Sequence, residues 1–338
     1  MADSRPDKIV PNDQRVQQKT AVLNGKTYSY LLAEPSGTPL LNTIFLIHGF
    51  PDLSLGWRYQ IPVLLSIGLR VVALDMMGYS GTDAPEETKY YTYKRAADDV
   101  ASLAEQLGLS SVILGGHDWG GAVVYRIAMH YPKLVSAFFS VCTPFQTPKS
   151  TYIPATVLPN FKYQLQFGGP DLEREIAGEE KIKQFLNAMY GGRGPNGEPA
   201  FDVSHGVYME NIPILRKTIL LSQSELDYYT QRYAIHGMHG PTNWYRTGKL
   251  NYEDEMDFAK AAEEKTLKFE MPVLFIGGTR DTALPPALSK GMENWFQNLS
   301  RGEVNASHWA LWEKPSEVND LIKKWLIGLT DVSLKAAL

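Results

Sequence analysis

The sequence is poor in several features that mark whole classes of protein. It has one cysteine, Cys142, among 338 residues, which excludes an internal disulfide and a zinc site built from several cysteines. The formal net charge is −4, so no basic surface for nucleic acid is expected. No apolar run is long enough to span a bilayer. No G-x-G-x-x-G motif follows a strand, so no dinucleotide cofactor is expected.

The amino terminus also has little of what a secretion signal needs. Residues 1–8 are polar and contain no apolar stretch. Together with the single cysteine, this predicts a cytoplasmic protein. The composition, with 44% hydrophobic and 21% charged residues, is that of a globular protein with an ample core.

What the chain does contain is a glycine-rich turn around an aspartate, in the motif Gly-His-Asp-Trp-Gly-Gly at residues 116–121. An apolar run with β-branched residues ends there, and a helix-like segment at residues 122–131 follows until Pro132. The pattern predicts a strand, a sharp turn and a helix, with Asp118 at the apex. This is the nucleophile elbow of the α/β-hydrolase fold with aspartate in place of serine.

The aspartate narrows the chemistry of such an elbow. Attack by serine on a saturated carbon would leave an inert ether, whereas attack by a carboxylate leaves an ester that water can cleave. Asp118 therefore indicates alkyl transfer rather than acyl transfer. The alternative is that Asp118 only caps the helix that follows, because aspartate is a favoured N-cap residue.

The order of elements along the chain predicts the architecture. Apolar and periodic stretches indicate an edge strand at residues 27–33, buried strands at 43–47, 70–75 and 271–278, and helices at 94–107 and 318–326. Strands that alternate with helices on this scale predict a mostly parallel sheet covered on both faces. Between the strands, residues 146–265 show helical stretches such as 172–189 but no buried strand. We therefore expect an α/β-hydrolase core in two parts, residues 1–145 and 266–338, interrupted by a helical cap at 146–265.

In the α/β-hydrolase fold, the catalytic triad follows the order nucleophile, acid, histidine, each on a loop after a strand. Asp281 is the only carboxylate in the loop after the strand at 271–278. His308 follows 27 residues later, beyond a short strand at 302–305, and is the only histidine in the second part of the core. The alternatives are a helix cap for Asp281 and a surface-loop role for His308.

The fold also predicts an oxyanion hole. Its two N–H donors come from the residue after the nucleophile and from the loop after an early strand, which here are Trp119 and Phe50. His48 is expected to order this loop, and Pro51 restricts the backbone of Phe50. For His117, next to the nucleophile, we expect a packing role.

Taken together, the motif His-Gly-Phe-Pro at residues 48–51, the elbow at 116–121, Asp281 and His308 resemble the soluble epoxide hydrolases of the α/β-hydrolase superfamily. The resemblance covers about residues 20–330. The elbow alone is also similar to that of haloalkane dehalogenases. However, such enzymes often place a halide donor where this chain has Phe50, whose side chain has none.

The resemblance further implies two cap tyrosines that donate hydrogen bonds to the epoxide oxygen. The segment Gly-Pro-Thr-Asn-Trp-Tyr-Arg is similar to the second tyrosine segment of the family and indicates Tyr245. The segment Phe-Lys-Tyr-Gln-Leu-Gln-Phe looks like the first and indicates Tyr163. Tyr152 and Tyr190 are alternatives for the first position.

The implied reaction is the hydrolysis of a small apolar epoxide to a vicinal diol. Asp118 would form an alkyl ester, which water activated by His308 and Asp281 would hydrolyse, without a cofactor or a metal. The His236 and His239 pair lacks a third ligand with suitable spacing. The expected pocket residues are Phe50, Pro51, Trp119, Phe161 and Trp244.

Two other functions fit parts of the pattern. A haloalkane or haloacid dehalogenase would use the same aspartate and would release halide rather than form a diol. A small-molecule binding module on a hydrolase scaffold would show no turnover, for example with styrene oxide. The presence of Asp118, Asp281 and His308 together favours an enzyme.

Overall fold

The computed structural model describes residues 6–158 and 161–336, and its centre is an eight-stranded sheet in the order β1-β2-β4-β3-β5-β6-β9-β10. All neighbours from β4 to β10 are parallel, and β2 is antiparallel to β4. The strands are β1 (Gln17–Leu23), β2 (Lys26–Ala33), β3 (Asn42–Ile47), β4 (Leu69–Asp75), β5 (Val112–His117), β6 (Val135–Val141), β9 (Phe269–Gly278) and β10 (Phe296–Val304). The predicted mostly parallel sheet is thus present.

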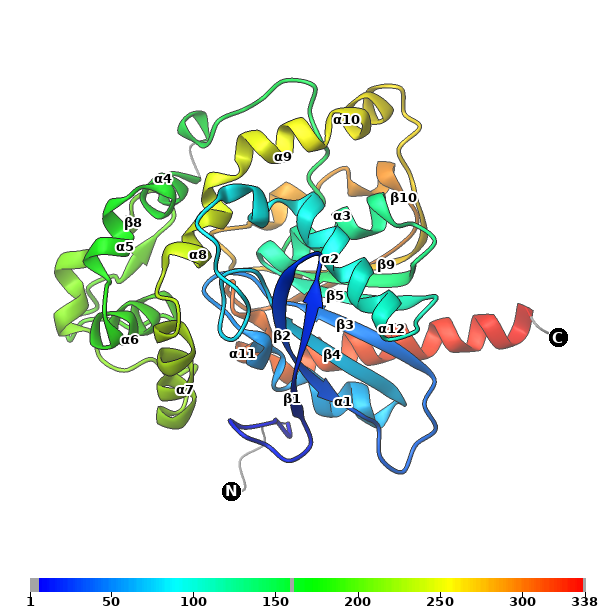
Figure 1. Ribbon diagram of the computed structural model, residues 1–338, viewed down its shortest axis with the longest axis horizontal. Helices are drawn as coiled ribbons and strands as arrows, with labels where there is room; N and C mark the ends of the chain where they lie inside the picture. Colours follow the sequence, from blue (N-terminus) through cyan, green and yellow to red (C-terminus); the bar gives the residue numbers. More distant parts are fainter. Residues whose placement is uncertain (1–5, 159–160, 337–338) are drawn as a thin grey trace.

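Helices cover both faces of this sheet, as Figure 1 shows. Helices α2 (Tyr93–Gln106) and α3 (Trp119–His130) lie on one face, and α1 (Gln60–Ser66) and α12 (Pro315–Ala336) lie on the other. Because both faces are covered, the central strands β3 and β5 are buried along nearly their whole length. This double burial explains why their sequences are continuously apolar rather than alternating.

The structure corrects the prediction at the amino-terminal edge of the sheet. The strand expected there at residues 27–33 is β2, but β1 pairs with it and forms the edge instead. Strand β1 is polar and largely exposed, so no apolar period marks it. The available signal was the pair Asn24 and Gly25, both with positive φ, which is typical of a two-residue hairpin turn.

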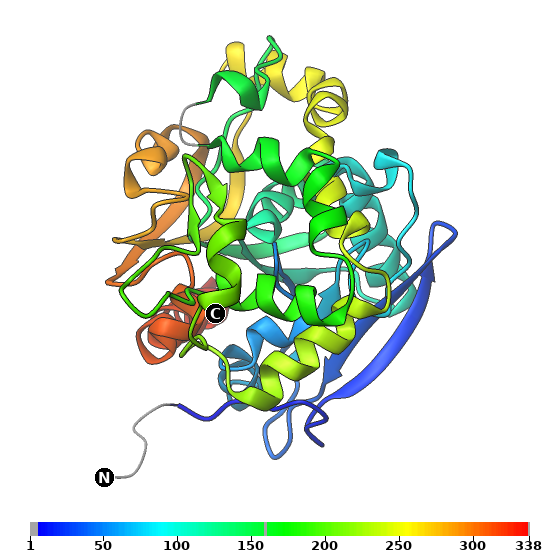
Figure 2. The same ribbon diagram turned by 90° about the vertical axis from the view of Figure 1, so that its left-hand side faces the viewer.

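The segment 146–265, which we call the cap, lies between β6 and β9 in the chain, and its described residues, 146–158 and 161–265, are mainly helical. Figure 2 shows their helices in front of one end of the sheet. The helices are α4 (Tyr163–Gly168), α5 (Asp171–Glu175), α6 (Glu179–Met189), α7 (Gln223–Ala234), α8 (His239–Asn243), α9 (Gly248–Asp254) and α10 (Met256–Glu263). A small ribbon of β7 (Phe201–Asp202) and β8 (Gly206–Val207) was not predicted. The expected helical stretch at 172–189 is broken near Gly178, whose φ is 91°.

Short helical elements follow the last strands of the sheet. Helix α11 (Ala310–Glu313) lies directly after the loop that carries His308 and packs against α12. In the part of the chain that the structure describes, no helix combines the length and the apolarity needed to cross a membrane.

Candidate active site

The predicted elbow lies at the carboxyl end of β5. Strand β5 ends at His117, α3 begins at Trp119, and Asp118 between them has φ 55° and ψ −127°. A non-glycine residue rarely adopts this backbone conformation, and such strain is typical of functional sites. The turn points the Asp118 carboxylate into a cavity between the core and the cap.

The glycines around this turn are required by close contacts. A Cβ atom on Gly120 would lie 2.0 Å from the carbonyl oxygen of Ile47, and one on Gly49 would lie 2.1 Å from Oδ1 of Asp118. Neither distance is sterically possible. Glycine at 120 therefore lets α3 approach the backbone of Ile47, and glycine at 49 lets the residue 48–51 loop approach the Asp118 side chain.

We expect Gly120→Ala to lower the free energy of unfolding by about 3 kcal/mol, because the methyl group has no space next to a backbone carbonyl. Gly328→Ala is the matched control, since a Cβ there meets nothing within 4 Å in the exposed face of α12. The control should raise stability by about 0.5 to 1 kcal/mol. Urea unfolding of both variants measures the difference. Equal stabilities would contradict the steric argument.

The structure brings Asp118, His308 and Asp281 into one chain of contacts. The Nε2 atom of His308 lies 3.2 Å from Oδ2 of Asp118, and Nδ1 lies 2.8 Å from Oδ2 of Asp281. The other oxygen of Asp281 accepts the N–H groups of Ala283 and Leu284, each at 2.9 Å. These bonds hold the Asp281 carboxylate so that its free oxygen faces the imidazole.

Charge within this chain of contacts sets the protonation of His308. Burial disfavours the charged ring, but the carboxylates of Asp281 and Asp118 outweigh burial and raise the pKa of His308 to about 10. Burial raises the pKa of Asp118 and Asp281, yet the facing imidazolium lowers both overall. At neutral pH the resting site therefore holds two carboxylates around one imidazolium.

The side chains of His117 and Cys142 both contact the backbone carbonyl oxygen of His308. Nε2 of His117 lies 2.8 Å from the carbonyl oxygen of His308, and the Cys142 thiol donates to the same oxygen at 3.4 Å. Burial lowers the pKa of His117 to about 4, so its ring is neutral and donates through Nε2. The sequence predicted only packing for His117, but this side chain also holds the loop that carries His308.

The same three side chains are the one group in the described part of the chain with the spacing of a metal site, with ligand atoms within 4.8 Å of one another. A metal would need the thiolate of Cys142, and burial raises the pKa of that thiol well above its usual range. In the pair His236 and His239, the ring of His239 instead contacts Glu173, with 2.9 Å between Nδ1 and Oε2. We assign no metal to either place.

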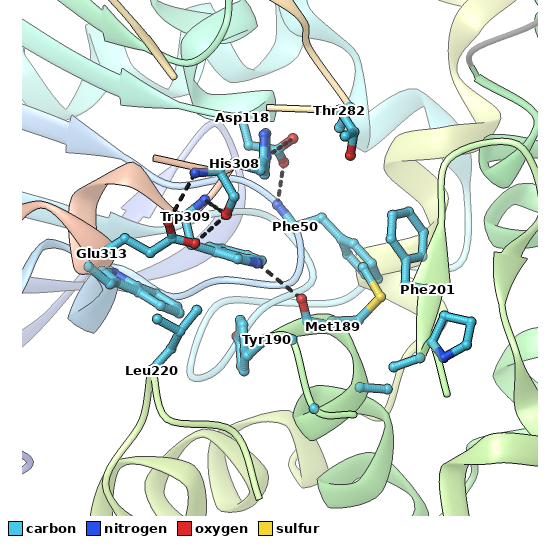
Figure 3. Close-up of a pocket in the computed structure, with 18 of the residues that line it drawn as sticks. Phe50, Asp118, Met189, Tyr190, Phe201, Leu220, Thr282, His308, Trp309 and Glu313 are labelled. Carbon is cyan, nitrogen blue, oxygen red and sulfur yellow. Dashed lines mark hydrogen bonds and ion pairs between the residues drawn. The ribbon is translucent and has the colours of Figure 1, made fainter. Parts of the chain in front are cut away.

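The residue 48–51 loop faces the nucleophile. The Phe50 N–H donates to Oδ1 of Asp118 at 2.6 Å, as Figure 3 shows, and the Phe50–Pro51 peptide bond is cis. His48 accepts the Met76 N–H through Nε2 at 3.0 Å, and burial lowers its pKa. A neutral His48 thus orders the loop. Trp119 is the first residue of α3, so its backbone N–H directly follows Asp118.

The cavity has a volume of about 690 Å³, and both tyrosines indicated by the sequence, Tyr163 and Tyr245, line it. Tyr163 and Tyr245 lie close together, with ring centroids 6.2 Å apart, and Tyr245 also contacts Phe50 and Trp119. Burial, reinforced by the charge of Asp118, raises the pKa of both phenols. Both therefore keep their O–H protons at neutral pH.

The alternatives for the first tyrosine differ in position. Tyr152 is 39% exposed and does not line the cavity. Tyr190 does line it, but its O–H donates to the carbonyl oxygen of Pro51. Tyr163 therefore fits the predicted role better than Tyr152 or Tyr190.

Of the five side chains expected in the pocket, Phe50 alone belongs to the described cavity wall. The indole N–H of Trp244 donates to the Met77 carbonyl oxygen at 3.0 Å, away from the cavity. Neighbours on a helical turn point in different directions, so Tyr245 faces the cavity and Trp244 faces the core. Phe161 lies beside the Tyr163 ring, and Pro51 and Trp119 adjoin Phe50 and Tyr245 without lining the cavity.

Several wall residues were not found from the sequence. Trp309 follows His308, and its indole N–H donates to the Met189 carbonyl oxygen at 3.0 Å, as drawn in Figure 3. Position next to His308 was the only available signal for it. The cavity wall also includes charged residues from both the cap and the core, namely Arg193, Arg280, Glu313 and Lys314.

The sequence of this chain is similar to that of known proteins over most of its length. The family model described as alpha/beta hydrolase fold matches residues 42–315. Epoxide hydrolase srdG of Neurospora crassa is 38% identical in an alignment that covers 95% of this chain and 98% of that protein. Bifunctional epoxide hydrolase 2 of Rattus norvegicus is 33% identical over 84% of this chain, which spans only 51% of that longer protein.

A solved structure agrees with these sequence matches. Epoxide Hydrolase A from Mycobacterium thermoresistibile superposes with a TM-score of 0.77 at 28% identity, covering 93% of this chain and 98% of that chain. The similarity therefore extends over the core and the cap together.

Proposed function

The chain belongs to the epoxide hydrolases of the α/β-hydrolase fold family, and from this premise we propose that it converts epoxides to vicinal diols through a covalent ester on Asp118. The observation that carries the proposal is the contact chain from Asp118 through His308 to Asp281, open to a cavity that also contains Tyr163 and Tyr245.

The first half-reaction is attack by Asp118 on one epoxide carbon, in line with the C–O bond that breaks. The ring oxygen gains negative charge, and the protonated phenols of Tyr163 and Tyr245 donate to it. One phenol passes its proton to that oxygen and becomes a phenolate. Raised phenol pKa values support this arrangement, because both groups are donors before the reaction.

Ester formation changes the charge around His308. The ester of Asp118 is neutral, so one of the two carboxylates that raise the pKa of His308 disappears. The imidazolium then releases a proton more readily, and this proton restores the phenol. His308 thereby becomes a base only after the ester has formed.

The second half-reaction is hydrolysis of the ester. Neutral His308, oriented by Asp281, takes a proton from water, and the hydroxide attacks the carbonyl carbon of Asp118. The N–H groups of Phe50 and Trp119 stabilise the oxyanion. Collapse expels the diol oxygen, which takes the proton from His308. The Asp118 carboxyl then gives its proton to His308, which restores the resting ion pair.

A single turnover in ¹⁸O-water, with enzyme in excess over styrene oxide, tests this route. Because the water oxygen enters the Asp118 carboxyl and the diol oxygen leaves from it, the first diol should be unlabelled and the peptide containing Asp118 should gain ¹⁸O. Mass spectrometry of the diol and of the digested protein measures both. Label in the first diol, with none in the peptide, would mean direct attack by water on the epoxide.

A parallel assay with a haloalkane separates this function from dehalogenation. We expect diol from the epoxide and no halide release, because Phe50 offers no side-chain N–H to a leaving halide.

A further inference from the structure

A buried cluster of tyrosines joins the cap to the loop that carries the Phe50 N–H. The Tyr229 O–H of α7 donates to Oδ1 of Asp52 at 2.6 Å, and the Tyr233 O–H donates to the Asp52 carbonyl oxygen at 3.1 Å. Tyr190 donates to the carbonyl oxygen of Pro51. Three cap hydroxyls thus bind the two residues that follow Phe50.

The cluster is buried and tightly packed. Tyr190, Tyr229 and Tyr233 are at most 2% exposed, and Asp52 is 1% exposed. The Asp52 N–H donates to the Gly49 carbonyl oxygen at 3.0 Å, which closes the turn around Phe50. A shift of Asp52 would therefore move the Phe50 N–H relative to Asp118.

The start of α7 is fixed independently of this cluster. Glu225 closes a capping box with Ser222 and also pairs with Arg58 and Lys8, at 3.2 and 2.7 Å. The helix is thus attached to the core at one end by ion pairs, and one turn later it presents Tyr229 to Asp52. This anchorage means that removing a single hydroxyl leaves the helix in place.

We propose that Tyr229 is a positioning residue for ester hydrolysis, acting through Asp52 to hold the Phe50 N–H where the oxyanion forms. The proposal rests on the covalent route described above. Oxyanion donors act on the tetrahedral intermediate of the second half-reaction, so their displacement slows hydrolysis more than alkylation.

Electrostatics support the importance of the hydroxyl. Burial raises the pKa of Asp52 to about 7, and the Tyr229 hydrogen bond opposes that rise. Oδ1 of Asp52 also accepts the Leu53 N–H at 2.7 Å, so Tyr229→Phe leaves this buried carboxyl with its backbone donor but removes its side-chain donor. Loss of a hydrogen bond to a buried carboxyl is unfavourable. We therefore expect the turn at residues 49–52 to shift when the Tyr229 hydroxyl is removed.

The test is Tyr229→Phe, with Tyr228→Phe as the matched control on the same helix. Tyr228 is half-buried, and its ring faces Arg232 rather than the loop. For Tyr229→Phe we expect ester decay to slow about tenfold, a part of the roughly 10²-fold or greater loss when a whole oxyanion donor is removed. The alkylation rate should stay within about twofold, so that kcat falls while kcat/KM is kept.

Rapid quenching followed by mass spectrometry of the intact protein measures both half-reactions. If Tyr229→Phe does not fold, Tyr233→Phe takes its place, because its hydroxyl binds the same residue. Unchanged ester decay, or equal slowing of both half-reactions, would overturn the positioning role. Absence of any ester in the unmodified enzyme would instead overturn the covalent route, so the two failures are distinguishable.

Discussion

His308→Gln is expected to stop turnover while the enzyme still forms its covalent ester. The raised pKa of His308 makes it an imidazolium in the resting site, and in the proposed mechanism it becomes the base for water only after Asp118 is alkylated. Glutamine cannot take that proton, so we expect kcat to fall by about 10⁴-fold, as for other triad members. Alkylation should slow far less, because the nucleophile Asp118 and the tyrosines are intact.

The adduct itself is the decisive measurement. After mixing with excess styrene oxide, intact mass spectrometry should show nearly one substrate added per His308→Gln molecule, and digestion should locate it on Asp118. His236→Gln is the control, because His236 is exposed on the cap and should leave turnover unchanged. A variant that turns over normally, or that accumulates no adduct, would contradict the role given to His308.

The double variant Tyr163→Phe, Tyr245→Phe is expected to fail at the opposite half-reaction. In the proposed mechanism each phenol donates to the oxygen that leaves the epoxide carbon, and a general acid contributes typically about 10² to 10⁴-fold. We expect alkylation to slow by about 10²-fold in each single variant and by about 10⁴-fold in the double variant.

Alkylation is best followed in the His308→Gln background, where the ester persists and its rate of appearance can be measured directly. Tyr152→Phe is the matched control, since Tyr152 lies outside the cavity wall and should not change that rate. Ester formation by the double variant within about tenfold of the parent rate would exclude the two phenols as the acids.

Local patterns predicted the elements that build the core. The apolar stretches of β3, β4 and β9 are visible in the sequence because these strands are buried on both faces. Strand β1 was missed because an exposed edge strand needs no apolar residues. Its pairing with β2 is stabilised by backbone hydrogen bonds, which leave little trace in side-chain composition.

The direction of side chains in the cap was less predictable. Trp244 and Tyr245 are neighbours, and the sequence indicated Trp244 as a pocket residue and Tyr245 as a hydrogen-bond donor to the substrate, yet only Tyr245 lines the cavity. The difference depends on how the short helical turn at residues 244–246 packs against the core. A segment of three residues is too short for its own period to specify a face.

The sequence by itself determined that a carboxylate lies at the apex of the elbow, and it predicted the chain order of the two residues that complete the contact chain, Asp281 and His308. The elbow around Asp118 is encoded within six residues, because the steric demands of a sharp turn act locally and admit only glycine at certain positions. Tertiary structure alone separated Tyr163 from its alternatives Tyr152 and Tyr190, and decided that Tyr229 binds Asp52 across 177 positions of the chain. Such contacts arise from the packing of the cap against the core, and no local pattern of residues specifies that packing.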